Sequence, residues 1–241
     1  MAGGFTIISV LMLTYQRHYL LEEAIKSFLR QDYKGESEMV IVNDSQNVEY
    51  VFEHPKIRII NLKERFPSIG HKLRFGFSHC RYDYIYRLDD DDLLTPWALS
   101  HSWEDILEHP DYEIYRSDGH YFFEHNHFKG ISSNVNNGNI YTKKYLSRIV
   151  IPDISIGEDY AMTFKFNANI YVSPREQKSM IYRWGMGTYH VSGMGNISNN
   201  AIHKWTDRIV KSEGKERKTN LEKGLLVLNP HFQNDYYRQI L

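Results

Sequence analysis

Along the first ninety residues, apolar runs of strand length alternate with segments whose apolar residues recur on one helical face. These patterns predict strands at residues 5–13, 38–42, 56–62 and 82–88 and helices at residues 19–29 and 69–80. Strand–helix–strand passes of this length need crossover connections, which pair the strands in parallel and are right-handed. We therefore expect an α/β fold with a doubly wound, mostly parallel sheet.

The pattern changes after residue 92. Thr95 and Pro96 suit the N-cap and the first position of a helix that runs to residue 107. The rest of the chain predicts strands at residues 112–123, 138–142, 170–172 and 179–184, a turn at residues 132–139, and a helix at residues 158–166 that begins after Gly157. Four glycines in residues 185–195 indicate a mobile loop, and one helix with a polar tail follows from residue 199.

Composition excludes several classes of protein. The 241 residues include 29 Lys and Arg and 30 Asp and Glu, so no net charge attracts nucleic acid or an anionic membrane. The basic surplus between residues 204 and 223 is typical of a solvated helix face, and we expect no nucleic-acid partner. A hydrophobic content of 41% excludes a disordered chain.

Cysteine usage and the first apolar run bear on the compartment. Cys80 is the only cysteine, which excludes an intrachain disulfide and fits a reducing compartment. The run at residues 5–13 has no basic residue before it and is far shorter than the roughly 20 residues of a membrane span. We therefore expect a cytoplasmic protein with no signal peptide or transmembrane helix.

Polar residues follow three of the predicted parallel strands. They are Thr14-Tyr15-Gln16-Arg17, Asn43-Asp44-Ser45 and Asp89-Asp90-Asp91-Asp92. Ligands of doubly wound sheets bind beyond the carboxyl ends of the strands. We therefore expect these residues to form one ligand-binding rim.

The aspartate run is the most informative of the three segments. A solvated turn that caps the next helix would explain one or two aspartates, but Thr95 and Pro96 already supply that helix start. Four like charges are costly to pack unless a cation neutralises them, and carboxylate oxygens suit Mg²⁺ or Mn²⁺. Such an ion commonly also binds substrate phosphates. The run therefore predicts a metal–diphosphate site.

A second acidic segment, Gly157-Glu158-Asp159-Tyr160, opens a predicted helix. Carboxylates in the first turn of a helix are favoured by the helix dipole. Taken alone, this segment is therefore explained by the stability of the helix and needs no catalytic role. Beside the aspartate run it gains a second interpretation. Transfer of a group to a hydroxyl needs one carboxylate as general base and a separate charge that stabilises the leaving group.

Taken together, these motifs resemble family 2 of the inverting, nucleotide-sugar-dependent glycosyltransferases with the GT-A fold. Five segments carry the resemblance, in the family's order: residues 9–17, 40–45, 69–76, 84–92 with the Asp-X-Asp motif, and 157–160 with the Glu-Asp motif. The resemblance implies a Rossmann-like, doubly wound sheet flanked by helices, with a smaller sheet on the acceptor side. It also implies a GT-A domain over residues 1–198, with a nucleotide-binding half at 1–92 and an acceptor half at 93–198, followed by a C-terminal helical extension at 199–241.

The resemblance also implies a role for each matching residue. Asp44 would bind the nucleobase in a pocket lined by Thr14, Tyr15 and Arg17. Asp89 would meet the ribose and, with Asp91, the Mn²⁺ or Mg²⁺ ion, to which His190 would be a further ligand. Asp159 would be the base, with Glu158 beside it. The remaining substrate-binding candidates are Lys72, Arg74, Asp90 and Trp184.

The donor would be a nucleoside-diphosphate sugar, with a UDP-sugar favoured, and the acceptor a carbohydrate or another hydroxyl compound. The chain departs from the family where Asn43 replaces an acid and where no glycine follows Asp44. Processive members carry Gln-X-X-Arg-Trp, but Met180 stands at the glutamine position before Arg183 and Trp184, which favours transfer of a single sugar. The loop at residues 185–195 would be a lid over the donor.

Two other function classes also place acidic groups on such a sheet. A magnesium-dependent nucleotidyltransferase or a phosphatase is one, although a nucleotidyltransferase needs a glycine-rich phosphate loop and residues 15–18 contain no glycine. A GT-A-like module that binds nucleotide sugars without turnover is the other. Such a module has no need of a base such as Asp159.

Overall fold

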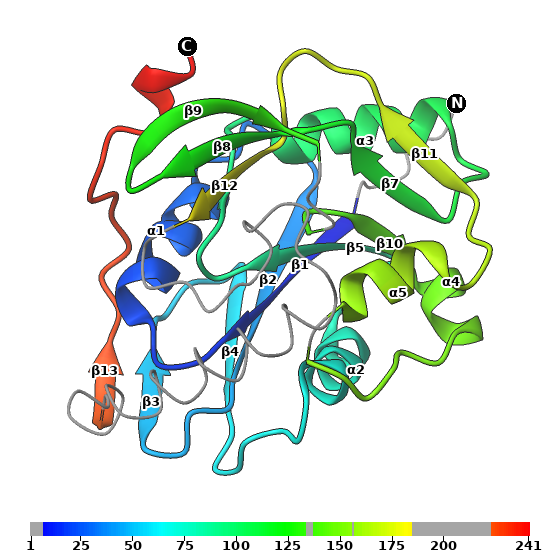
Figure 1. Ribbon diagram of the computed structural model, residues 1–241. Helices are drawn as coiled ribbons and strands as arrows, with labels where there is room; N and C mark the ends of the chain where they lie inside the picture. The colour runs from blue at the N-terminus through cyan, green and yellow to red at the C-terminus, as the bar shows by residue number, and fades with distance from the viewer. Residues whose placement is uncertain (1–6, 134–136, 156, 185–222) are drawn as a thin grey trace, which may run out of the picture.

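The computed structural model describes residues 7–133, 137–155, 157–184 and 223–241, and Figure 1 shows a central sheet with helices on both faces. The seven-stranded sheet comprises, in spatial order, β11 (Ile170–Ser173), β7 (Ile114–Ser117), β10 (Ile140–Thr142), β5 (Tyr84–Asp89), β1 (Ile7–Thr14), β2 (Glu36–Asn43) and β4 (Ile57–Asn61). Only β10 is antiparallel to its neighbours in this sheet. The predicted doubly wound, mostly parallel sheet is confirmed.

Two helical layers cover the sheet. The helices are α1 (His18–Leu29), α2 (Ile69–His79), α3 (Ala98–Glu108), α4 (Lys143–Arg148) and α5 (Glu158–Phe164). Side chains alternate along β1, so Ile8 and Val10 pack with buried residues of α1 and α3, while Leu11 packs with those of α2, α4 and α5. Both faces of β1 are therefore buried, which explains its nearly continuous apolar sequence.

A smaller sheet comprises β6 (Leu93–Leu94), β12 (Met180–Trp184), β8 (His120–Glu124) and β9 (His127–Ser132), in that spatial order. The prediction of one strand over residues 112–123 is wrong, because β7 and β8 belong to different sheets and the chain turns between them. An apolar pattern reports which residues are buried. It does not report in which sheet they are buried, so it could not locate this break.

The predicted N-cap at Thr95 is also wrong. Helix α3 begins at Ala98, and its N-cap residue Trp97 makes no side-chain capping bond. The Thr95 hydroxyl instead donates to the carbonyl of Lys178 at 3.0 Å, and its N–H donates to the carbonyl of Ser179 at 3.1 Å. Thr95 therefore anchors the chain just before β12.

The C-terminal segment returns to the first half of the molecule. Strand β13 (Gly224–Val227) pairs in parallel with β3 (Val48–Val51), and the short 3₁₀ helix η2 (Tyr237–Gln239) lies near the C-terminus. Figure 1 shows this segment running from β13 past α1 to the vicinity of β9. Part of the expected helical extension lies outside the described residues, and residues 223–241 form this strand and 3₁₀ turn instead of an α-helix. The domain boundaries remain a prediction. Among the described helices, none is long and apolar enough to span a membrane.

Candidate active site

The ends of β1, β2 and β5 meet at one edge of the main sheet. Thr14 pairs with Asn43, and Leu13 pairs with Asp89. The turn after β1 is tied to the turn after β2, because the N–H of Gln16 donates to the Ser45 hydroxyl at 3.1 Å. The rim of polar strand ends expected from the sequence is therefore present.

Asn43, which replaces an acid of the family pattern, holds the turn after β2. Its side chain is fully buried, and its Oδ1 accepts a hydrogen bond from the N–H of Ser45 at 3.1 Å. Its Nδ2 donates to the carbonyl of Val48 at 3.0 Å and to Asn61 Oδ1 at 2.9 Å. A carboxylate has no donor for those two acceptors, so the amide suits this position.

Asp44 lies in a buried polar cluster with Lys72 and Thr14. Lys72 Nζ is 2.5 Å from Asp44 Oδ1 and 2.6 Å from the carbonyl oxygen of Thr14. Burial lowers the pKa of Lys72, and the nearby Asp44 carboxylate opposes that shift. Asp44 Oδ2 also accepts the N–H of Phe66 at 3.1 Å. The structure thus brings together three of the predicted substrate-binding residues.

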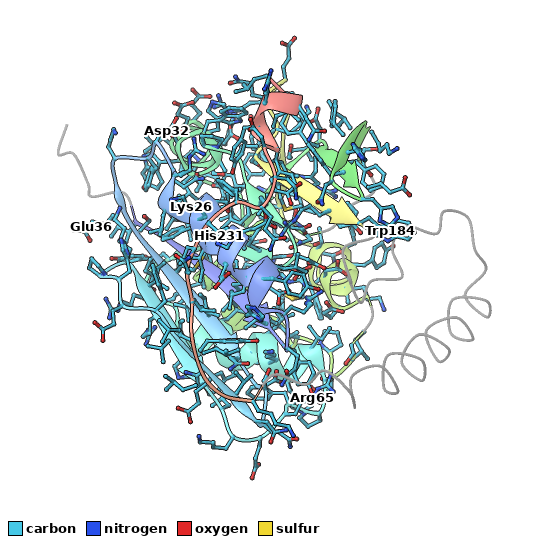
Figure 2. The ribbon with its side chains drawn as sticks, turned by 90° about the vertical axis from the view of Figure 1, so that its left-hand side faces the viewer. Lys26, Asp32, Glu36, Arg65, Trp184 and His231 are labelled. Atoms are coloured by element: carbon cyan, nitrogen blue, oxygen red, sulfur yellow. The ribbon has the colours of Figure 1, made fainter. Side chains whose placement is uncertain are left out.

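Tyr15 directly follows Thr14 in the chain and is half-buried. The guanidinium carbon of Arg65, a residue that sequence reasoning did not select, is 4.1 Å from the centre of the Tyr15 ring. Arg65 is exposed and is labelled in the lower part of Figure 2. A planar cation over an aromatic ring is a favourable pair.

The aspartate run is buried and partly neutralised by Arg17. Arg17 Nη1 is 2.9 Å from Asp91 Oδ2, and the same guanidinium forms an ion pair with Asp90. The Arg17 guanidinium therefore supplies part of the positive charge that the run requires. Arg17 thus contacts the aspartates, and its place in the nucleobase pocket stays a prediction.

Three of the four aspartates present oxygens suitable for a metal ion. One oxygen each of Asp89, Asp91 and Asp92 lie within 4.8 Å of one another. Asp92 is oriented by the N–H of Arg183 at 2.9 Å and by Asn137 Nδ2 at 2.5 Å. A set of hard carboxylate oxygens fits Mg²⁺ or Mn²⁺.

The surroundings of Asp90 and Asp92 disfavour the charged form of both carboxyl groups. Burial raises the pKa of Asp90 to about 6, with Asp91 adding to the shift and Arg17 opposing it. Burial and the charge of Asp91 raise the pKa of Asp92 well above its ordinary value. A divalent cation would supply the missing positive charge.

Glu158 and Asp159 begin α5 and share one arginine with the aspartate run. Arg87 Nη2 is 3.1 Å from Glu158 Oε1 and 3.3 Å from Asp89 Oδ1, and Nη1 is 3.8 Å from Asp159 Oδ2. Burial disfavours the charged form of Arg87, but these three carboxylates outweigh it and raise its pKa. Burial raises the pKa of Glu158 despite the arginine. The two acidic motifs are therefore neighbours in space.

A second buried arginine, Arg183, supports the aspartate run from β12. Its Nε donates to the carbonyl of Asp91, and its Nη1 pairs with Glu23 on α1 and contacts the Tyr236 hydroxyl at 3.1 Å. Sequence reasoning missed Arg87 and did not select Arg183 as a site residue. The available signal was a charged residue inside an otherwise apolar or aromatic strand.

Three predicted site residues lie apart from these clusters or outside the described chain. Arg74 donates to the carbonyl of Ile151 at 2.5 Å and pairs with Asp153, on the segment that leads to α5. Trp184 is half-buried at the end of β12 and lies at the periphery in Figure 2, on the opposite side from Glu36. His190 and the glycine-rich segment 185–195 lie outside the described residues.

Sequence comparisons connect this site with glycosyltransferases. Residues 9–169 match the family model for glycosyl transferase family 2. An uncharacterized glycosyltransferase of Haemophilus influenzae is 28% identical over 115 residues, covering 44% of this chain and 43% of the relative. The putative colanic acid biosynthesis glycosyl transferase WcaA of Escherichia coli is 37% identical over 100 residues, covering 39% and 36%. The matches thus span less than half the length of these curated relatives.

Solved structures share the fold at low sequence identity. S. aureus TarS 1–349 in complex with UDP-GlcNAc has a TM-score of 0.62 and 16% identity, over 86% of this chain and 66% of that one. The mannosyltransferase PcManGT from Pyrobaculum calidifontis, in complex with GDP-Man and Mn²⁺, has a TM-score of 0.55 and 14% identity, over 92% and 67%. The GT-A fold expected from the sequence motifs is thereby confirmed.

Proposed function

The chain belongs to glycosyl transferase family 2, and we propose that it transfers one sugar from a nucleoside-diphosphate sugar to a hydroxyl acceptor, with inversion at the anomeric carbon. The acceptor is a carbohydrate or another hydroxyl compound. The observation that carries the proposal is the single guanidinium of Arg87 between Asp89 on one side and Glu158 and Asp159 on the other. That arrangement puts a candidate base next to a candidate cation site.

The nucleotide would lie across the ends of β1 and β2. Asp44, Thr14 and Tyr15 would contact the nucleobase, and Asp89 the ribose. Lys72 is held by Asp44 and the Thr14 carbonyl, so its role would be to fix Asp44. Arg17, which contacts Asp91, would meet the diphosphate. The UDP and UDP-GlcNAc bound to the TarS neighbours support a UDP-sugar as donor.

Asp159 is the residue we assign as general base. Its carboxylate is partly exposed, and its Oδ1 accepts the N–H of Tyr160 at 2.7 Å, which fixes the side chain at the start of α5. In the proposed step, Asp159 removes the acceptor hydroxyl proton as the oxygen attacks the anomeric carbon. The bond from that carbon to the diphosphate breaks on the opposite face, which inverts the configuration.

Asp89 and Asp91 would hold the divalent cation, Mn²⁺ or Mg²⁺, whose positive charge stabilises the leaving diphosphate. Asp92 would support the site through the hydrogen bonds that it accepts from Arg183 and Asn137. The Mn²⁺ in the complex of the PcManGT neighbour supports the use of a divalent cation. Among the side chains of the protein, Arg17 would add a second positive charge near the leaving diphosphate.

Incubation of the protein with UDP-, GDP- and dTDP-sugars, with Mn²⁺, Mg²⁺ or EDTA, tests the proposal. We expect slow release of nucleoside diphosphate from one donor class, with water as acceptor, only when a cation is present. A module that binds without turnover would instead show cation-dependent binding and no release. A nucleotidyltransferase would release pyrophosphate from a nucleoside triphosphate. Either of those results would contradict the proposal.

A further inference from the structure

Arg87 lies on the face of β5 that also carries the buried Ile85 and, at the strand end, Asp89. It pairs with Leu11 of β1, and its side chain is only 3% exposed, in the layer that holds Ile85 and Leu73. Its backbone is fixed as well, because its N–H donates to the carbonyl of Asn139 and its carbonyl accepts the N–H of Gly138. The guanidinium therefore has a defined place beneath the site.

The local hydrogen bonding does not fully satisfy this buried charge. The guanidinium donates to Glu158 Oε1, while Nε and Nη1 are buried without a hydrogen-bond partner among the described residues. A buried, incompletely bonded cation destabilises a fold relative to an apolar side chain of similar volume. Packing alone therefore gives no reason for an arginine at this position. The reason must come from the three carboxylates around it.

We propose that Arg87 is a positioning residue for the transfer step, an inference that rests on the proposed function. Its Nη2 lies 3.1 Å from Glu158 Oε1 and 3.3 Å from Asp89 Oδ1, and its Nη1 faces Asp159 Oδ2 at 3.8 Å, an ion pair without a hydrogen bond. One rigid group thus sets the location of the base relative to the aspartates that would hold the cation. Misplacement of a catalytic group by about 1 Å can cost roughly 10²-fold in rate, so such a link has a measurable effect.

A positioning role and a merely structural role of Arg87 predict different effects of its removal on cation binding. Arg87 places a positive charge 3.3 Å from Asp89, where it competes with a divalent cation for the same carboxylate. Removing the guanidinium should therefore slow transfer through a misplaced Asp159, yet leave cation binding unchanged or make it tighter. Loss of a residue that only maintains the fold would weaken both properties together.

The test compares Arg87→Met and Arg87→Lys with Arg175→Met. Arg175 is a suitable control because it also contacts two carboxylates, Glu104 at 3.1 Å and Asp105 at 2.9 Å, outside the site. Isothermal titration with Mn²⁺ gives the cation affinity, and donor-saturation kinetics with Mn²⁺ give kcat and KM. Circular dichroism reports whether each variant is folded.

For Arg87→Met we expect kcat to fall by about 10²-fold, while the Mn²⁺ dissociation constant stays equal or decreases, and the donor KM changes by less than about threefold. Arg87→Lys keeps the charge and should retain more activity than Arg87→Met, and Arg175→Met should match the wild type. Turnover within twofold of the wild type in Arg87→Met, or a parallel loss of turnover and Mn²⁺ affinity in both Arg87 variants, would overturn the inference. A wild-type protein that binds Mn²⁺ and nucleoside diphosphate but transfers no sugar, even to water, would overturn the proposed function and this inference with it.

Discussion

The ion pair between Arg183 and Glu23 connects three parts of the chain, and its removal gives a sharp stability prediction. Arg183 lies on β12, Glu23 on α1, and their side chains are 1% and 0% exposed. The arginine also contacts the Tyr236 hydroxyl of the C-terminal segment and the Asp91 carbonyl. Arg183→Met keeps an apolar side chain of moderate length but removes all of these polar contacts.

The size of the effect follows from the charge that is left behind. In Arg183→Met, Glu23 stays buried, and within the described chain it keeps the N–H of Gln233 at 2.8 Å and the Tyr236 hydroxyl at 3.2 Å as donors. Neither donor carries a positive charge that would replace the guanidinium. Breaking a buried pair by removing one partner costs about 3–5 kcal/mol. For a chain of this size that loss corresponds to a decrease of roughly 6–20 °C in Tm.

Urea and thermal unfolding of Arg183→Met, Glu23→Leu and the double variant measure this pair as a double-mutant cycle. We expect each single variant to be strongly destabilised and the double variant to be more stable than the sum of the two predicts, because it leaves no buried charge unpaired. Arg148→Met is the control, since Arg148 pairs with Glu113 at the surface and should leave Tm close to that of the wild type. A loss below about 1 kcal/mol in Arg183→Met, or strictly additive variants, would refute this reasoning.

Three further predictions concern the acids of the site and one buried histidine. Asp91→Ala should abolish Mn²⁺-dependent binding of nucleoside diphosphate in calorimetry while the circular dichroism spectrum stays unchanged; unchanged affinity would remove Asp91 from the cation site. Asp159→Asn should keep donor affinity but lower kcat by roughly 10²–10⁴-fold, and near wild-type turnover would move the base elsewhere. Burial lowers the pKa of His120 from 6.5 to about 3, so the unfolded chain binds the extra proton and stability is lost as the pH falls through that range. Between pH 7 and pH 5, the free energy of unfolding measured in urea should therefore fall by about 2 kcal/mol less in His120→Phe than in the wild type. In His127→Phe, which changes an exposed histidine, it should fall as much as in the wild type.

The parallel half of the fold was predictable because the apolar pattern of each segment there agrees with the way in which the segment is buried in the fold. Both faces of β1 and β2 are buried, so their apolar runs are long, and α1 and α2 each present a clear apolar face. The break between β7 and β8 and the pairing of β13 with β3 were not predictable. Both depend on contacts between different segments of the chain. The apolar pattern of a strand does not indicate the strand with which it pairs.

The acidic residues of the site were predictable and the arginines that hold them were only partly so. Asp89 and Asp91, the predicted cation ligands of the run, have oxygens within 4.8 Å of each other and of an Asp92 oxygen, because the run follows a strand at the ligand-binding edge of the sheet. Arg87 interrupts the apolar run of β5, and in a sequence such a residue is easily interpreted as an exposed position. Its meaning depends on Glu158 and Asp159, which are about 70 residues away in the chain.

The most direct test of the central claim, cation-dependent transfer with inversion, is the anomeric configuration of the product determined by proton NMR. With an α-linked nucleoside-diphosphate sugar and Mn²⁺, we predict that the first sugar product, formed on an acceptor or on water, has the β configuration. No product should form with EDTA or with Asp91→Ala. A first product that retains the α configuration, or equal release of nucleoside diphosphate with and without the cation, would contradict the account.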